Sequence, residues 1–278
     1  MAPDPRVPTA VRQRIAAWLG EASEVARGWQ GRIHPTLKPT DPRQVLTEAD
    51  LALSELICGR VRAAFPAHNL IDEEAGVIDR GSAFTWVIDP IDGTSNFAVG
   101  SPLYAIFIGL LDGGEPVAGG ISMPALGQVF TAERGGGAFL NDGPLEVPAQ
   151  RELSEVLVAC SIDGDPAAPE WVRRFGALFA ELTLASRGVR SSNSGFDIGA
   201  LLSGAYAAAI FSNGKVWDFV GPLGVCVEAG YRCTRLDGSA FDFSRALLEP
   251  EMTYDGVLAA PGLHAPLLAL LGRTAQRR

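Results

Sequence analysis

Two aspartates close an apolar run in the segment WVIDPIDGTSNF, which occupies residues 86–97. Asp89 and Asp92 are separated only by a proline and an isoleucine, and Gly93 follows at once. Proline stops a strand and glycine permits a sharp turn, so both carboxylates should lie at one strand end. Two carboxylates about 4 Å apart repel each other by roughly 4 kcal/mol at an effective dielectric of about 20. Such a pair favours a shared proton or a hard divalent cation with oxygen ligands, such as Mg²⁺.

Other acidic residues strengthen the cation hypothesis. The motif alone fits an ordinary strand-end turn equally well, with each aspartate accepting a backbone hydrogen bond. Glu73 and Glu74 end the short predicted strand NLID, and pairing of this strand with TWVID would bring Glu73 beside Asp89. Asp218 follows Trp217 at the start of a predicted helix, where it could instead be an N-cap.

The elements before residue 150 must position most of these acids. Apolar residues at helical spacing predict helices over residues 9–31 and 48–65, with a proline-rich loop between them. Short apolar segments with turn residues between them then predict a meander of antiparallel strands. The segment RGGGAF is assigned to one of its hairpins, because the Lys-Ser or Lys-Thr ending of a phosphate loop is absent. Residues 1–150 are therefore expected to carry two helices, an antiparallel sheet and most metal ligands.

Strands and helices alternate after residue 150. Helices are predicted near residues 170–182, 196–202 and 219–229 and at the C-terminal end, with apolar strand segments between them. Residues 151–278 are expected to form an α/β half that carries Asp218.

Composition limits the class of partner. The 278-residue chain has a formal charge of −9, which argues against nucleic acid as a partner, so an anionic substrate would need metal cations to attract it. The N-terminus lacks an apolar signal region and no apolar run is long enough to span a bilayer, so we expect a cytoplasmic protein with no membrane partner. Two sets of residues complete these expectations. The predicted buried free thiols are Cys58, Cys160, Cys226 and Cys233, and the predicted surface or capping histidines are His34, His68 and His264.

Five segments together resemble a known family. They are TEAD at 47–50, DEE at 72–74, WVIDPIDGTSNF, GGGAFLN, and WDFVGPLGVCVEAG from Trp217. In this order and spacing they are similar to the inositol monophosphatase family of metal-dependent, lithium-sensitive phosphomonoesterases, over almost the whole chain. The resemblance implies an α+β or α/β fold, the layered αβαβα sandwich of the sugar-phosphatase type, and a homodimer.

The resemblance also implies a set of metal ligands. Glu73, Asp89 and the carbonyl oxygen of Ile91 would hold one Mg²⁺, and a second ion would lie among Asp89, Asp92 and Asp218. A weaker third ion would lie near Glu73, and Mn²⁺ could substitute for Mg²⁺.

Phosphate and water would be held by neighbouring residues. The resemblance implies that the backbone N–H groups of Gly93 and Thr94 bind the phosphate, as helix N-termini bind anions. Thr94, oriented by Asp50 and acting with Glu73, would position the attacking water. Such chemistry needs no nucleophilic side chain, and the sequence contains no G-x-S-x-G motif.

The substrate side departs from the family. Phe211 stands seven residues before the last metal aspartate, where inositol-specific members commonly have an acid, which puts inositol phosphate in doubt. Asn193, Ser194 and Gly195 should line the non-phosphate end of the substrate, although a simple helix-start loop explains them as well. Lys215 could meet a second anionic group, and a solvated loop lysine is the alternative that we rank first.

The sequence therefore predicts a Mg²⁺-dependent phosphomonoesterase for a small phosphorylated polyol, sugar or amino alcohol. Alternative substrates within this class are 3′-phosphoadenosine phosphate, fructose bisphosphate and histidinol phosphate. The alternative from another class is a non-catalytic regulatory or binding protein on the same fold, which intact acidic residues disfavour.

Overall fold

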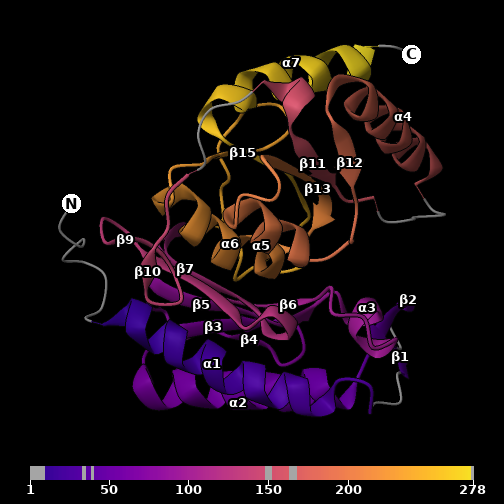
Figure 1. Ribbon diagram of the computed structural model, residues 1–278. Helices are drawn as coiled ribbons and strands as arrows, with labels where there is room; N and C mark the ends of the chain where they lie inside the picture. Colours follow the sequence, from indigo (N-terminus) through magenta and orange to yellow (C-terminus); the bar gives the residue numbers. More distant parts are fainter. Residues whose placement is uncertain (1–9, 33–35, 39–40, 148–151, 163–167, 277–278) are drawn as a thin grey trace.

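The computed structural model describes residues 10–32, 36–38, 41–147, 152–162 and 168–276. Helices and sheets alternate in layers, as Figure 1 shows from bottom to top. The order is α1 with α2, an eight-stranded sheet, α5 with α6, a five-stranded sheet, and α4 with α7. This arrangement confirms the layered αβαβα sandwich.

The outer helix layer covers one face of the first sheet. Helix α1 spans Val11–Trp29 and buries a stripe of apolar residues at helical spacing, including Ile15, Leu19 and Ala22. Helix α2 spans Glu48–Ala64 and begins with a capping box, in which the Thr47 hydroxyl accepts the Asp50 N–H and the Asp50 carboxylate accepts the Thr47 N–H. The helix ends before Pro66, as predicted. This cap fixes Asp50, which belongs to the site described below.

The first sheet has the strand order β10-β9-β8-β7-β6-β5-β3-β4. Its pairs are antiparallel except β3 and β5, which run parallel with Asp72 opposite Ile88. The meander prediction therefore holds from β5 onward, and the parallel pair brings the end of β3 beside the end of β5. The strands are β3 (Asn69–Asp72), β4 (Gly76–Ile78), β5 (Phe84–Asp92), β6 (Ala105–Asp112), β7 (Glu115–Met123), β8 (Gln128–Glu133), β9 (Gly137–Leu140) and β10 (Gly143–Pro144).

The second sheet has the order β12-β11-β13-β15-β14, with β11 parallel to both of its neighbours and the other pairs antiparallel. Its strands are β11 (Leu157–Cys160), β12 (Gly188–Arg190), β13 (Ala208–Gly214), β14 (Arg232–Thr234) and β15 (Tyr254–Ala259). Two helices cover its outer face, α4 (Pro169–Ala185) and α7 (Pro261–Gln276). Two others separate it from the first sheet, α5 (Phe196–Leu202) and α6 (Val216–Glu228).

Glycines allow α6 to approach the first sheet closely. A Cβ atom built at Gly119 of β7 would lie 2.1 Å from the carbonyl oxygen of Gly221 in α6. A Cβ atom at Gly109 of β6 would lie 2.6 Å from the Gly221 nitrogen, and one at Gly224 would lie 2.7 Å from the carbonyl carbon of Ala118. Helix and sheet backbones are therefore in direct contact, and this contact sets the position of α6 over β6 and β7.

Several local expectations need correction. The predicted proline-rich loop contains an antiparallel hairpin, β1 (Thr36–Lys38) and β2 (Asp41–Leu46), whose pairing the prolines of the segment hid from the sequence. Helix α6 begins at Val216, three residues before the predicted start, so Asp218 lies inside its first turn. Short helical turns were not predicted at α3 (Thr94–Ala98), η1 (Pro124–Leu126) and η2 (Leu153–Glu155).

The histidine prediction was wrong for His264 and lies outside the described residues for His34. His264 is 7% exposed within α7 and shares a hydrogen bond of 3.0 Å with the Thr234 hydroxyl. His68 is half-buried and stacks between Phe65 and Phe84. Both rings are thus used in packing, where burial lowers their pKa.

All four cysteines are free thiols, as predicted. Three are buried and Cys233 is half-buried. Among the described residues, no helix combines the length and the apolar character that crossing a membrane would need.

The close approach of α6 gives a direct test of the fold. Gly119→Ala should destabilise the protein by about 3 kcal/mol, because the new methyl group meets backbone that cannot move independently. The matched control is Gly59→Ala in α2, where no atom of the described residues beyond the neighbouring backbone of the helix lies within 4 Å of the added Cβ. This control should gain about 0.5–1 kcal/mol of stability from helix propensity. Urea unfolding measures both, and equal effects of the two substitutions would contradict the packing described here.

Candidate metal centre

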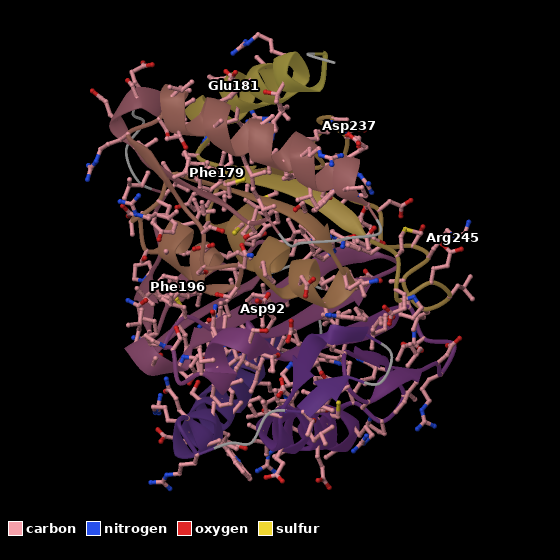
Figure 2. All side chains as sticks on the ribbon, turned by 90° about the vertical axis from the view of Figure 1, so that its right-hand side faces the viewer. Asp92, Phe179, Glu181, Phe196, Asp237 and Arg245 are labelled. Atoms are coloured by element: carbon pink, nitrogen blue, oxygen red, sulfur yellow. The ribbon has the colours of Figure 1, made fainter. Side chains whose placement is uncertain are left out.

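Three carboxylates converge where the two halves of the molecule meet. Asp89 and Asp92 lie in β5, and Asp218 lies in the first turn of α6. One oxygen from each of the three lies within 4.8 Å of the other two. Figure 2 labels Asp92 near the middle of the molecule, where the first sheet meets the helices that separate the two sheets.

A strand irregularity brings the two aspartates of β5 together. Side chains three positions apart in a regular strand point to opposite faces of a sheet. Here Asp89 pairs with Phe107 and Asp92 pairs with Ala105, so three steps on β5 match two steps on β6. The extra residue forms a bulge at the proline, which lacks an N–H for the ladder. The bulge turns both carboxylates toward Asp218.

Asp89 carries the highest electrostatic cost. Its side chain is 1% exposed, and its Oδ1 atom has no hydrogen-bond partner among the described residues. Burial raises the pKa of Asp89 well above its usual value, and the negative charges of Glu73, Asp92 and Asp218 raise it further. A buried, unpaired carboxylate oxygen surrounded by other carboxylates fits a hard divalent cation, which would supply the missing positive charge.

Glu73 reaches the cluster through the parallel pairing of β3 with β5. Its N–H donates to the carbonyl oxygen of Ile88 at 3.3 Å. The preceding Asp72 fixes the turn, because its Oδ1 accepts the N–H groups of Glu74 and Ala75 at 2.9 and 2.6 Å. Among the neighbouring charges, that of Glu73 raises the pKa of Asp89 the most. Its carboxylate is nevertheless not part of the three-oxygen group.

A hydroxyl group links α2 to the turn after β5. The Thr94 Oγ1 atom lies 3.1 Å from Asp50 Oδ1 and 2.9 Å from the carbonyl oxygen of Ile91. Its single hydrogen can be donated to only one of them at a time. Burial raises the pKa of Asp50 to about 6, although hydrogen bonds from Thr47 oppose that shift. Thr94 is thus held between a buried carboxylate and a backbone carbonyl.

Gly93 is required at the turn itself. Its φ is +92°, a backbone conformation that residues other than glycine rarely adopt. A Cβ atom here would also lie 2.6 Å from the Cβ of Ser194. The backbone at the start of α3 can therefore follow the end of β5 directly.

The predicted substrate-side residues occupy different environments. Phe211 is half-buried on β13, where it pairs with Gly256 and packs against the central core. Asn193 is exposed, and its side-chain amide bonds the backbone of Ile162 with Nδ2 to oxygen at 2.8 Å. Ser194 is 5% exposed and Gly195 is also buried, so neither presents much surface to a ligand.

Lys215 is held by a neighbouring acid. Its ammonium donates to the carbonyl oxygen of Glu251 at 2.6 Å and lies 3.1 Å from the carboxylate of the same residue. Its backbone N–H donates to Asp218 Oδ2 at 2.6 Å, which orients this carboxylate at the start of α6. The Lys215 backbone therefore contacts the acidic cluster, whereas its charged end is bound elsewhere.

Sequence reasoning did not single out Asn96 or Asp197. Asn96 donates to the carbonyl oxygens of Leu103 and Ser192, both at 2.8 Å. Asp197 accepts the Ser192 N–H at 2.9 Å. The only signal in the sequence was the position of Asn96 inside the aspartate motif, because its partner Ser192 lies 96 residues away.

The layered sandwich with carboxylates of β5 and α6 at its centre defines a metal-dependent phosphatase of the sugar-phosphatase type. Residues 9–274 match the profile of the inositol monophosphatase family. A probable inositol 1-monophosphatase of Mycobacterium tuberculosis is 34% identical over 229 residues, which cover 81% of each chain. A histidinol-phosphatase of Chlorobaculum parvum is 45% identical over 109 residues, or 39% of this chain and 42% of the relative.

Solved structures agree with the sequence comparisons. The crystal structure of the extragenic suppressor protein SuhB of Bartonella henselae superposes with a TM-score of 0.83 at 25% identity, and the match covers 95% of this chain and 98% of that one. The chain therefore belongs to the inositol monophosphatase family, whose members are metal-dependent phosphomonoester hydrolases.

The electrostatic cost of Asp89 predicts that its replacement stabilises the metal-free protein and removes the stabilisation by metal ions. Asp89→Asn should raise the melting temperature of the metal-free protein at pH 7, because it removes a buried acid whose pKa is raised in the folded state. We also expect Mg²⁺ to raise the melting temperature of the wild-type protein, and the same change should abolish that rise. Calorimetry with and without Mg²⁺ measures both effects. A variant that Mg²⁺ still stabilises as it does the wild type would contradict the ligand role.

Asp50 predicts a pH dependence of stability in the metal-free protein. Its folded pKa of about 6 exceeds the unfolded value of 3.8, so the folded state binds more protons between these values. The stability from this group is complete below pH 3.8 and is lost as pH rises through about 6. Relative to Asp50→Asn, the wild type should lose roughly 3 kcal/mol across that window. Urea unfolding of both proteins at several pH values measures the difference, and a pH-independent difference would refute it.

Proposed function

We propose that this chain is a Mg²⁺-dependent phosphomonoesterase for a small phosphorylated polyol, sugar or amino alcohol. The observation that carries the proposal is the convergence of Asp89, Asp92 and Asp218, together with the buried Oδ1 atom of Asp89, which has no hydrogen-bond partner in the described part of the chain. Carboxylate oxygens alone favour Mg²⁺ or Mn²⁺ over the softer metals that prefer sulfur or imidazole.

Five residues would hold two to three ions. Glu73, Asp89 and the carbonyl oxygen of Ile91 form one proposed set, and Asp89, Asp92 and Asp218 form the other, with Glu73 also serving a weaker third ion. Bound ions would neutralise the phosphate dianion, lower the pKa of a water molecule and stabilise the leaving alkoxide. The proposed division of the chain follows from these sets, since residues 1–150 supply every ligand except Asp218.

Residues of the chain itself would bind the phosphate and position the attacking water. We propose that the backbone N–H groups of Gly93 and Thr94 bind the phosphate oxygens at the turn after β5. The Thr94 hydroxyl is already directed by Asp50 and Ile91, so it can accept a hydrogen bond from a water molecule while donating its own hydrogen. Glu73 would accept the second hydrogen of that water and hold it for in-line attack. No covalent intermediate with a side chain is needed.

Residues on the substrate side and the named relatives restrict the range of candidate substrates. Relatives named for inositol phosphate and for histidinol phosphate both resemble this chain. Phe211 offers no acceptor for a sugar hydroxyl, which disfavours inositol phosphate itself. Asn193, Ser194 and Gly195 are proposed for the substrate side. Lys215 would favour a bisphosphate only if a substrate displaced Glu251 from its ammonium.

The proposal extends to assembly, inhibition and location. The family resemblance supports a homodimer and lithium sensitivity. Four free cysteines support a reducing compartment such as the cytoplasm. The net charge of −9 supports a small-molecule partner over nucleic acid.

A non-catalytic binding protein is the alternative from another class. The carboxylate cluster around the buried Asp89 disfavours it, because neighbouring acids raise the pKa of Asp89 and cost stability unless a ligand compensates for them. Thr94 is also engaged with Asp50 as catalysis would need.

Phosphate release from a substrate panel tests the function. The panel contains inositol 1-phosphate, histidinol phosphate, fructose 1,6-bisphosphate and 3′-phosphoadenosine 5′-phosphate, each with Mg²⁺, with Mn²⁺ and with a chelator. We expect metal-dependent hydrolysis of at least one monoester, and a loss of at least about 1000-fold in Asp89→Asn, because that change removes a ligand proposed for both ions. Metal binding without hydrolysis of any panel member would favour the binding protein instead.

A further inference from the structure

The turn at residues 192–195 lies directly behind Asp92. The N–H of Gly195 donates to Asp92 Oδ1 at 2.7 Å, a hydrogen bond to a charged acceptor. The turn is packed closely against β6, because a Cβ atom at Gly195 would lie 2.1 Å from the ring of Phe107 and 3.0 Å from the Cβ of Ala105. One carboxylate oxygen of Asp92 is thus oriented by backbone from the other half of the chain.

Two side chains hold the start of this turn from opposite sides. Asp197 of α5 accepts the N–H of Ser192 at 2.9 Å, and Asn96 of α3 donates to the carbonyl oxygen of Ser192 at 2.8 Å. Both backbone polar groups of Ser192 are therefore fixed.

Asn96 also ties the turn to the first half of the chain. Its amide donates a second hydrogen bond, to the carbonyl oxygen of Leu103 at 2.8 Å. The Ser194 hydroxyl donates to the same oxygen at 2.9 Å. Asn96 follows β5 by only four residues, so it joins the strand that carries Asp92 to the turn that orients Asp92.

We propose that Asn96 and Asp197 are positioning residues that hold the Ser192–Gly195 turn against Asp92 and so fix the direction of a metal-binding carboxylate. The inference rests on the proposed function, because it takes Asp92 as a metal ligand. Residues that orient a ligand commonly change metal affinity or activity by about 10–100-fold when they are replaced. The N–H of Gly195 then orients Asp92, in addition to the substrate-side role proposed for this turn.

The environment of Asp197 supports its proposed role in positioning the turn. The side chain is fully buried, and its Oδ1 atom has no hydrogen-bond partner among the described residues. An incompletely satisfied buried carboxylate is unfavourable for stability alone. Its retention is explained if the hydrogen bond from Ser192 to its other oxygen is needed to hold the turn.

Asn96→Asp tests the inference. The substitution keeps the shape of the side chain, but it replaces two donated hydrogen bonds with a carboxylate facing two carbonyl oxygens. We expect the Mn²⁺ dissociation constant, measured by electron paramagnetic resonance without substrate, to rise about 10-fold. The Mg²⁺ concentration for half-maximal activity should rise in parallel.

The matched control is Asn69→Asp in β3, beside the end of β5 that lies away from Asp92. Asn69 is fully buried and donates to the Ser82 carbonyl oxygen at 2.7 Å and the Thr85 hydroxyl at 3.1 Å. Its substitution loses a comparable pair of donors far from Asp92 along the strand. We expect a lower melting temperature with Mn²⁺ affinity within about 2-fold of the wild type, since no ligand contact changes. Equal losses of Mn²⁺ affinity in the two variants would overturn the inference, because they would show a general effect of stability.

A second pair of variants separates hydrogen bonding from packing. Asp197→Asn retains an acceptor oxygen for the Ser192 N–H, whereas Asp197→Leu removes it. We expect Mn²⁺ affinity close to wild type in the first and clearly weaker in the second. Should Asn96→Asp fail to fold, Asn96→Ala removes the same donors without adding charge. If the wild type binds Mn²⁺ and Asn96 variants bind it equally well, this inference fails alone. If the wild type binds no Mn²⁺ and releases no phosphate, the proposed function fails with it.

Discussion

Repulsion between the buried carboxylate of Asp89 and the half-buried carboxylates around it is the constraint on which the rest of the structure depends. Asp89 is almost completely buried, and three other acids raise its pKa further. A chain can hold such a group only if the surrounding backbone is rigid enough to prevent the acids from separating. The bulge in β5, the parallel pairing that brings Glu73 close, and the N–H bonds to Asp92 and Asp218 all supply that rigidity.

The second requirement is that acids from distant parts of the chain meet. Asp218 belongs to a helix whose glycines contact the glycines of β6 and β7, so its place relative to β5 is set by backbone packing rather than by flexible side chains. Gly195 reaches Asp92 in the same manner, through a turn packed against Phe107. The cluster therefore forms only when the second half of the chain packs on the first sheet, which couples the site to the packing of the layers.

Local chemistry was visible in the sequence, whereas contacts between distant segments were not. The motif around Asp89 predicted a strand end with two acids, and the period of the apolar residues predicted α1 and α2 closely. Nothing local could show that three steps on β5 would match two on β6, because a bulge depends on the partner strand. The link from Asn96 to Ser192 and the burial of His264 depend likewise on residues far away in sequence.

The overall charge of the protein explains why such a costly cluster is useful. A chain with a net charge of −9 repels a phosphate ester at long range, and the described acids at the site would repel it more strongly at short range. Divalent ions held by those acids would reverse the sign of the local field, so that the same carboxylates that destabilise the metal-free protein would create its attraction for an anion. Substrate affinity should then depend on how firmly each carboxylate is directed at its ion, so the hydrogen bonds behind Asp92 and Asp218 should contribute to it alongside the acids themselves.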